Sequence, residues 1–403
     1  MRDIDIDPRY SDQQVRDLFL RIWPIYRCLF IMIFSLFFAG VCVKILRKYK
    51  VNYVSIFGIE PANRMNEYQF YKLFLYWQSL LSFTLLVEVL NIKGYVNFGR
   101  EKVGPASWPT LTLIVLMILI MVNPFSYGYK KFRHELLLAL YYTVVAPFGL
   151  VRFKDFFFGD ILTSMVKPFI DIIFIANYFN FEQNQISGGT SPAWRNMDIK
   201  LHQCSPSNMA ILVVSLLPFH FRFWQCIYKY NETGLWFPNL VNAGKYFAGM
   251  MVIFFSYLVA DGSDAITKEF YVKFAVFSTL YSYSWDIVMD WGLLRGTRGF
   301  PSCLLRDRIK YPPSFYYFSA VTNLALRFAW ALPLIDNNFW SFYFSDSFNE
   351  YQILFFLLAF GETYRRAQWS LFRVENENIN NYEKYRAIHE IPKVIDDRDD
   401  DYC

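Results

Sequence analysis

Cysteine and histidine are scarce in this chain of 403 residues, and neither residue type clusters. The cysteines are Cys28, Cys42, Cys204, Cys226, Cys303 and Cys403, and the histidines are His134, His202, His220 and His389. Their spacings match neither a disulfide framework nor a metal site. The nucleophile motif G-x-S-x-G and the zinc motif H-E-x-x-H are also absent. We therefore expect no metal, no cofactor and no enzyme activity.

Internal repeats, low-complexity segments and a strong charge of either sign are missing as well. The formal net charge of +5 gives no reason to expect a nucleic-acid partner. Apolar and aromatic side chains are in excess: 55% of the residues are hydrophobic, with 43 Phe and 29 Tyr. A water-soluble protein of this length rarely carries so many, because its surface would be sticky. We therefore expect membrane lipids around it.

Long apolar runs, such as "LFIMIFSLFFAGVCV" over 29–43, predict membrane-spanning helices of roughly 20 residues each. No cleavage site follows the first run, which indicates a retained span. The candidate spans centre near residues 35, 80, 116, 142, 170, 217, 252, 279, 325 and 358. The prediction is an all-α polytopic membrane protein: a segment over 1–24, a transmembrane domain over 25–375, and a tail over 376–403 with a disordered end.

An even number of spans puts both termini on one side of the membrane. Lys and Arg outside the spans are more numerous on that side, which places both termini in the cytosol. The basic run from Lys44 to Lys50 is an exception, because this topology puts it on the other side. The sequon Asn231-Glu-Thr falls in the cytosol and is expected to be unglycosylated.

Ionisable side chains interrupt several apolar runs, where charge is energetically expensive. Asp286 and Asp290, in "WDIVMDWGLL", are four residues apart and would share one face of an α-helix. The other charges of this kind are Asp160, Lys167, Asp171, Lys245, Arg327, Glu362, Arg365 and Arg366, with Tyr246, Trp330 and Trp369 beside them.

Each charge also has a purely structural explanation. Charges near helix ends, such as Asp160 and Lys245, could snorkel to the interface. Asp286 and Asp290 could pair with Arg327 inside the bundle. The neighbouring aromatic residues could serve packing or an interfacial belt.

Taken together, the buried charges indicate an anionic guest. Three carboxylates do not neutralise Lys245, Arg327, Arg365 and Arg366, and each basic group costs about 3 kcal/mol or more at the bilayer centre. The planar fork of arginine suits phosphate or carboxylate oxygens. A neighbouring aspartate can accept the proton of a partly protonated phosphate, which sulfate lacks at neutral pH. This combination favours phosphate.

The same residues carry a resemblance to a known family. The segments "LVNAGKY", "WDIVMDWGLL", "LRDRIKYPPSFYY", "LALRFAW" and "ETYRRAQWSLFRVENENINNYEKYRAI" resemble the EXS domain, in the family's order, from about Cys28 to Ile391. The resemblance implies an all-helical transporter that exports inorganic phosphate through a central, channel-like path.

The resemblance also implies roles for individual positions. The phosphate-contacting residues of the family fall on Lys245, Tyr246, Asp286, Asp290, Arg327, Arg365, Arg366 and Asp160, and pore-lining or gating positions fall on Trp330, Trp369 and Glu362. One departure is Leu235, where the exporters have an arginine ten residues before the lysine of the G-K-Y motif. The segment before the first span is also too short for the SPX domain of the exporters.

A short chain without an SPX domain is similar to the yeast ER-retention-defective protein of the Golgi. We therefore expect a Golgi membrane protein that moves lumenal phosphate to the cytosol and so supports glycosylation and the retention of Golgi glycosyltransferases. ER and plasma membrane are less favoured locations. The oligomeric state stays open, a dimer included.

Two other functions remain open. The first is a membrane adaptor without transport activity, which would bind a Golgi coat or a glycosyltransferase-recycling factor through the basic loop at 295–310 and the tail. The second, less favoured, is a membrane enzyme. Carboxylates facing arginines resemble a phosphate-handling site, but no nucleophile or metal array accompanies them.

Overall fold

A computed structural model describes residues 12–92, 108–125, 129–146, 148–149, 151–187, 207–260, 262, 265–294, 296, 304–334 and 347–387. Within these ranges the chain is helical and contains no strand. The all-α prediction is therefore confirmed. The predicted disordered end of the tail, at 388–403, lies outside the described residues. The start of the predicted tail is helical, because the last helix continues to Ala387.

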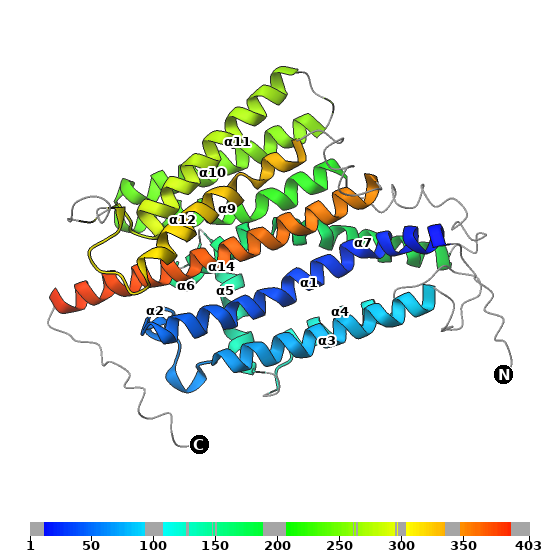
Figure 1. Cartoon of the computed structure of the whole chain (residues 1–403), viewed down its shortest axis with the longest axis horizontal. Helices are drawn as coiled ribbons and strands as arrows, with labels where there is room; N and C mark the ends of the chain where they lie inside the picture. Colours follow the sequence, from blue (N-terminus) through cyan, green and yellow to red (C-terminus); the bar gives the residue numbers. More distant parts are fainter. Residues whose placement is uncertain are drawn as a thin grey trace.

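The helices form an elongated bundle in which most elements run along the long axis (Figure 1). The long helices are α1 (Asp12–Lys48), α3 (Glu67–Ile92), α4 (Trp108–Val122), α7 (Val166–Ser187), α9 (Asn208–Thr233), α10 (Trp236–Ala260), α11 (Ala265–Trp285), α12 (Pro313–Arg327) and α14 (Ser347–Ala387). The remaining elements are α2 (Tyr53–Ile56), η1 (Pro61–Asn63), α5 (Lys130–Val145), α6 (Phe153–Thr163), η3 (Asp286–Asp290) and η5 (Ala329–Leu334).

Helix α14 lies in the middle of the bundle and runs parallel to α1 (Figure 1). Near the start of both helices, the rings of Trp23 and Phe356 are 5.8 Å apart. Further along, the Cys42 thiol donates to the carbonyl of Ala367 at 3.4 Å. Beyond the end of α1, the Asn52 amide donates to Asn378 at 2.9 Å. Both helices therefore begin at one end of the bundle and finish at the other.

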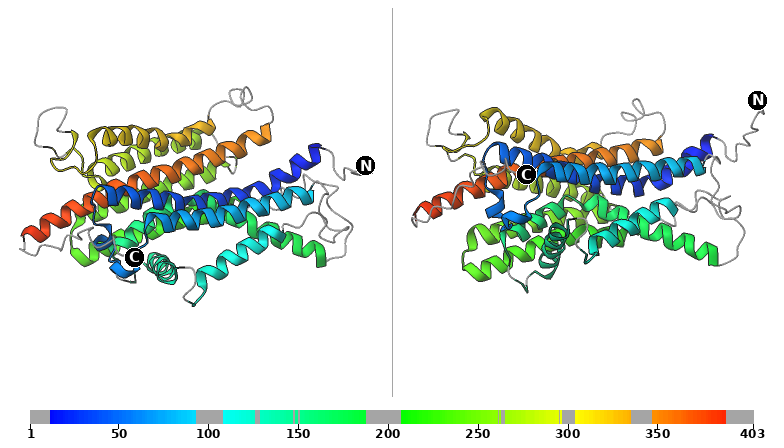
Figure 2. Two further views of the ribbon diagram at one scale, coloured as in Figure 1. Left: turned by 60° about the horizontal axis from the view of Figure 1, so that its bottom comes forward. Right: turned by 90° about the horizontal axis from the view of Figure 1, so that it is seen from below.

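This parallel course bears on the predicted topology. Four described helices are long and apolar enough to cross a membrane: Trp23–Lys48, Pro61–Leu90, Asn208–Thr233 and Trp236–Ala260, with Pro109–Val122 shorter. The count of ten spans is not confirmed. Helix α5, at the predicted fourth span, lies across the bundle (Figure 2). Helices α1 and α14 begin at one end of the bundle and finish at the other, and the placement of both termini on one side of the membrane stays a prediction.

Three helical segments of the described chain are interrupted along their length. The predicted fifth span consists of α6 and α7, separated at Ser164 and Met165. Helix α11 continues into the π-helix η3, and α12 into the 3₁₀ segment η5. Within a membrane, such irregular backbone is tolerated only where protein or a water-lined cavity surrounds it. The part of the bundle around these breaks is therefore the place to look for a functional site.

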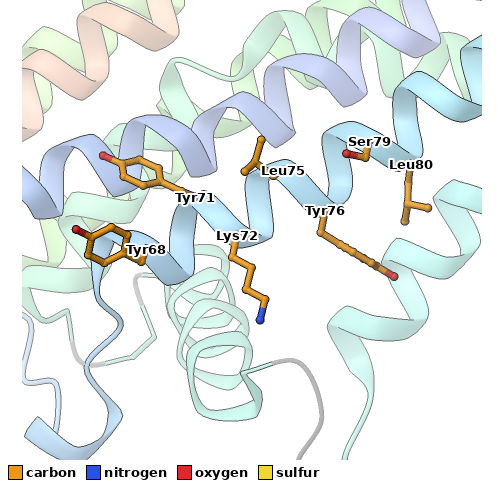
Figure 3. Close-up of a pocket in the computed structure, with 7 residues that line it drawn as sticks. All are labelled: Tyr68, Tyr71, Lys72, Leu75, Tyr76, Ser79 and Leu80. Carbon is orange, nitrogen blue, oxygen red and sulfur yellow. The ribbon is translucent and has the colours of Figure 1, made fainter. Parts of the chain in front are cut away.

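The outer surface is strongly apolar, as expected for a protein surrounded by lipid. Exposed large side chains include Phe83 and Leu86 on α3 and Ile118 and Leu119 on α4. The groove in Figure 3, of about 570 Å³, lies along α3 and is lined by Tyr68, Tyr71, Lys72, Leu75, Tyr76, Ser79 and Leu80. It contains none of the predicted site residues, and we interpret it as lipid-facing surface.

The parallel packing of α1 and α14 predicts a specific cross-link. An Ala367→Cys variant, with every cysteine except Cys42 replaced by serine, should be joined to Cys42 by a short bifunctional thiol reagent. The expected result is that two fragments stay together after cleavage at a protease site inserted in 188–206. The matched variant Phe356→Cys, nearer the other end of α14, should not cross-link to Cys42. Cross-linking at position 356 rather than 367 would contradict the parallel arrangement.

Candidate functional site

The interrupted elements surround the charged part of α14. Three of its polar residues, Glu362, Arg365 and Arg366, are spaced so that they reach different neighbours, and both arginines are buried. The neighbours are α6 with the α6–α7 break, η3, and α12. The predicted site residues thus meet where the helices are irregular.

Arg365 is fixed by two acids and an amide. Its Nε and Nη2 donate to the Glu362 carboxylate at 2.8 and 2.5 Å, and its Nη1 donates to Asn323 Oδ1 at 3.1 Å. The same Nη1 lies 3.6 Å from Asp286 Oδ2. With 2% of its side chain exposed, Arg365 is a desolvated cation whose charge is matched by carboxylates.

Asp286 links η3 to α12. Its Oδ2 accepts hydrogen bonds from Arg327 Nε and Nη2, at 3.0 and 2.6 Å, and from Asn323 Nδ2 at 2.9 Å. The predicted structural ion pair between Asp286 and Arg327 is thus present. Asp290 does not share these partners. The segment from Asp286 to Asp290 is a π-helix, so the α-helical spacing behind the prediction of a shared face does not describe it.

Arg366 differs from Arg365 in having only hydroxyl partners among the described residues. Its Nε donates to Ser164 Oγ at 2.7 Å, and its Nη2 donates to Thr163 Oγ1 at 3.1 Å. The Ser164 hydroxyl in turn donates to Glu362 at 2.6 Å. The Trp369 ring lies 4.6 Å from the guanidinium carbon. Within the described ranges no carboxylate oxygen lies within 4.0 Å of Arg366, although the residue is only 8% exposed.

A second group joins α6, α9 and α10. Arg222 Nε donates to Asp160 Oδ1 at 2.8 Å and to the Tyr246 hydroxyl at 3.0 Å, and that hydroxyl donates to the same Asp160 oxygen. Arg222 Nη1 donates to Gln225 at 2.6 Å, and the guanidinium lies between the rings of Phe156 and Tyr246. Asp160 is therefore neutralised by an arginine on a neighbouring helix.

Gly159 makes this contact possible. A Cβ atom at this position would lie 2.5 Å from Arg222 Cδ and 3.0 Å from Gln225 Oε1. Only a residue without a side chain lets α6 approach α9 so closely. The glycine therefore sets the distance at which Arg222 reaches Asp160.

Lys245, beside this group, has no polar partner in the described part of the chain. Its ammonium lies 4.5 Å from the centre of the Tyr246 ring and 5.3 Å from that of Trp285. No described carboxylate lies within ion-pair distance, although the charges of Asp290, Asp160 and Asp286 act on it. Lys245 is 8% exposed, so its charge is held by aromatic faces and by carboxylates at longer range.

Asp290 completes the set on the other side of Trp369. It accepts a hydrogen bond from Trp369 Nε1 at 3.0 Å, and its other oxygen lies 3.7 Å from Arg373 Nε. Arg373 also donates to Glu377 at 3.0 Å. The Trp369 ring stacks on Phe157 of α6, with centroids 5.7 Å apart. Trp369 therefore stands between Arg366 and Asp290 and touches both.

We call these residues the central cluster: Asp160, Arg222, Lys245, Tyr246, Asp286, Asp290, Arg327, Glu362, Arg365, Arg366 and Trp369. One predicted site residue, Trp330, lies apart from it, as does Leu235, the position that departs from the family pattern. Trp330, in η5, donates to Thr279 of α11 at 2.9 Å and contacts Tyr271 edge-on. Leu235 is 59% exposed beside the α9–α10 turn. The structure thus brings together every predicted residue except Trp330.

Sequence reasoning missed Arg222, Ser164, Thr163 and Asn323. Arg222 carried a signal, because it interrupts the apolar run "ILVVSLLPFHFRFW" just as Arg327 interrupts its own. The two hydroxyl residues and the asparagine carried none. Their importance depends on contacts across helices, which the local sequence does not encode.

Replacing Gly159 tests how the Asp160–Arg222 contact is set. Gly159→Val should separate α6 from α9 and lower the free energy of unfolding by about 1–3 kcal/mol, the usual cost of overpacking. Thermal unfolding in detergent measures this. The matched control is Gly149→Val, because a Cβ there meets only Tyr142 at an ordinary 3.7 Å. Equal stability of the two variants would show that the close approach does not matter.

Comparisons with known proteins agree with this picture. The EXS family model matches residues 22–379. The chain is 32% identical over 391 residues to SPX and EXS domain-containing protein 1 of Dictyostelium discoideum. This match covers 93% of this chain and 40% of that protein. It is 32% identical over 379 residues to the xenotropic and polytropic retrovirus receptor 1 homolog of Danio rerio; the match covers 92% of this chain and 52% of that protein.

A third relative is solute carrier family 53 member 1 of Mus terricolor, 31% identical over 383 residues, covering 92% of this chain and 52% of that protein. The chain spans about half the length, or less, of these relatives. The family model covers most of the described helices and the whole central cluster. The protein is therefore an integral membrane protein that belongs to the EXS family.

Proposed function

We propose that this protein transports inorganic phosphate across a membrane, along a path that passes the central cluster. One observation carries the proposal. Lys245 and Arg366 are both about nine-tenths buried, and no described carboxylate lies within ion-pair distance of either. A buried cation without a paired acid is costly, so a passing anion would stabilise it.

The surrounding groups suit phosphate. Arg366 offers a planar fork beside the hydroxyls of Ser164 and Thr163, so an anion can replace or join these neutral partners. Asp290, held by Trp369, can accept a hydrogen bond from a protonated phosphate oxygen. Glu362 keeps 31% of its side chain accessible, which leaves room for water or ligand beside the arginines.

Aromatic side chains narrow the same region. Trp369 stacks on Phe157 and separates Arg366 from Asp290, and Tyr246 lies against Lys245. We propose that Trp369 and Tyr246 restrict passage and thereby set the rate. Trp330 lies one helical turn beyond Arg327 and donates to Thr279 of α11. If Trp330 also restricts passage, it does so between α11 and α12.

We place the end of the bundle where α1 and α14 finish in the cytosol, and call it the basic end. The Lys310 ammonium donates to the Lys50 carbonyl at 2.6 Å there, and Arg306 pairs with Glu375 at 2.5 Å. Burial lowers the pKa of Lys310, and the charge of Glu375 opposes that shift. The run Lys44–Lys50, an exception in the predicted topology, now agrees with the positive-inside rule.

With this orientation the beginning of α1 faces the other side of the membrane. That differs from the predicted topology, in which both termini are cytosolic. Residence in the Golgi, a lumen-to-cytosol direction, and support of glycosylation and glycosyltransferase retention rest on the resemblance of the sequence to other EXS-domain proteins. They remain parts of the proposal.

Phosphate flux into liposomes tests the proposal. Purified protein should carry labelled phosphate, and Lys245→Met and Arg366→Met should each reduce the flux by at least about tenfold, the loss expected for one charge-assisted hydrogen bond. Lys72→Met is the matched control, because Lys72 is exposed on α3 away from the cluster. Each variant should elute from size-exclusion chromatography like the wild type.

The same experiment separates transport from an adaptor function. An adaptor should tolerate Arg366→Met and show no flux even as wild type. Lack of flux in wild-type protein, while a verified phosphate exporter is active in parallel, would end the transport proposal.

Glycosylation of Asn231 tests the orientation. Asn231 lies in the last turn of α9, which finishes at the basic end (Figure 1). About one and a half turns earlier, the side-chain amide of Gln225 donates to the backbone carbonyl of Asp155 in α6. Because glycosylation occurs in the lumen, Asn231 should remain unmodified in cells, as shown by unchanged mobility after glycosidase treatment. A sequon introduced ahead of α1 is the positive control and should be modified if presented far enough from the membrane. Glycan on Asn231 would reverse the orientation.

A further inference from the structure

Lys167 is an ionisable residue that the central cluster does not include. It lies in the first turn of α7, just after the break at Ser164 and Met165, and is partly buried. Ser164, three residues earlier, bonds both Arg366 and Glu362. Lys167 therefore lies within one helical turn of the hydroxyl residues that bind Arg366, in the interior of the bundle.

The acids near Lys167 are already engaged. The charges acting on its ammonium are those of Glu362, Arg27 and Asp171. Asp171 receives two hydrogen bonds from Arg27 of α1, at 2.9 and 2.5 Å, and Glu362 receives two from Arg365. Within the described ranges, Lys167 makes no ion pair or hydrogen bond through its side chain. It is thus a third cation without a matching acid.

The direction of α7 places Lys167 relative to the cluster. The Cys28 thiol of α1 donates to the carbonyl of Pro168, and Asp171 bonds Arg27, so α7 runs antiparallel to α1 toward the end where α1 begins (Figure 1). Lys167 is therefore on the side of Arg366 that faces away from the basic end. In the proposed orientation this is the non-cytosolic side.

We propose that Lys167 is an additional anion-binding residue, which holds phosphate on the non-cytosolic side before it reaches Arg366. The inference rests on the proposed transport function and deepens it. A single ammonium attracts an anion without locking its orientation, whereas the forked guanidinium of Arg366 fixes two oxygens. A site made first of Lys167 and then of Arg366 collects the anion and then orients it.

Sided transport kinetics test this assignment. Initial rates are measured in oriented liposomes with phosphate added on either side, for wild type, Lys167→Met, Lys167→Arg and the control Lys72→Met. In Lys167→Met, the half-saturating phosphate concentration on the non-cytosolic side should rise about tenfold. The value on the cytosolic side should stay within about twofold of wild type. Lys167→Arg should restore most of the affinity, because it keeps the charge.

Each outcome decides a different point. Unchanged half-saturation in Lys167→Met overturns the assignment of Lys167 and leaves the proposed function intact. An equal change on both sides shows general damage to the bundle and also overturns it. Absence of flux in the wild type removes the proposed function, and the assignment of Lys167 with it.

Discussion

The cost of burying positive charge among apolar helices governs this structure. Carboxylates offset this cost for three arginines. Arg222 pairs with Asp160 and Arg327 with Asp286 on neighbouring elements, and Arg365 pairs with Glu362 one turn earlier on the same helix. These pairs fix the mutual rotation of α6, α9, η3, α12 and α14. Lys245 and Arg366 are held instead by aromatic faces and hydroxyls. The pairs therefore form a rigid frame, and the unpaired cations give that frame an affinity for anions.

Helix interruptions allow the frame to form. At the α6–α7 break, the Ser164 and Thr163 hydroxyls accept hydrogen bonds from Arg366 of α14. The π-helix η3 presents Asp286 to α12 and Asp290 to Trp369. Gly159 lets α6 and α9 approach closely. Backbone irregularity and charge thus occur together inside the bundle, where protein rather than lipid surrounds both.

Much of the site could be predicted from local sequence. A charge inside an apolar run is visible without a structure, which is why Asp160, Lys245 and Arg365 were identified. Arg222 has the same signature and was overlooked. Ser164 and Asn323 have none, because a hydroxyl or an amide is common in helices and becomes significant only opposite an arginine. The π-helical spacing of Asp286 and Asp290 was equally invisible, since the same residues suit a regular helix.

The sequence by itself determined that the chain is an all-helical membrane protein, that it carries the motifs of the EXS family, and that both acidic and basic groups interrupt its apolar runs. Hydropathy and motif order are properties of local segments, so they can be read along the chain. Only the tertiary structure decided which cations are paired, and that α1 runs parallel to α14. Both depend on the depth, rotation and direction of helices far apart in sequence, which are set by packing between them.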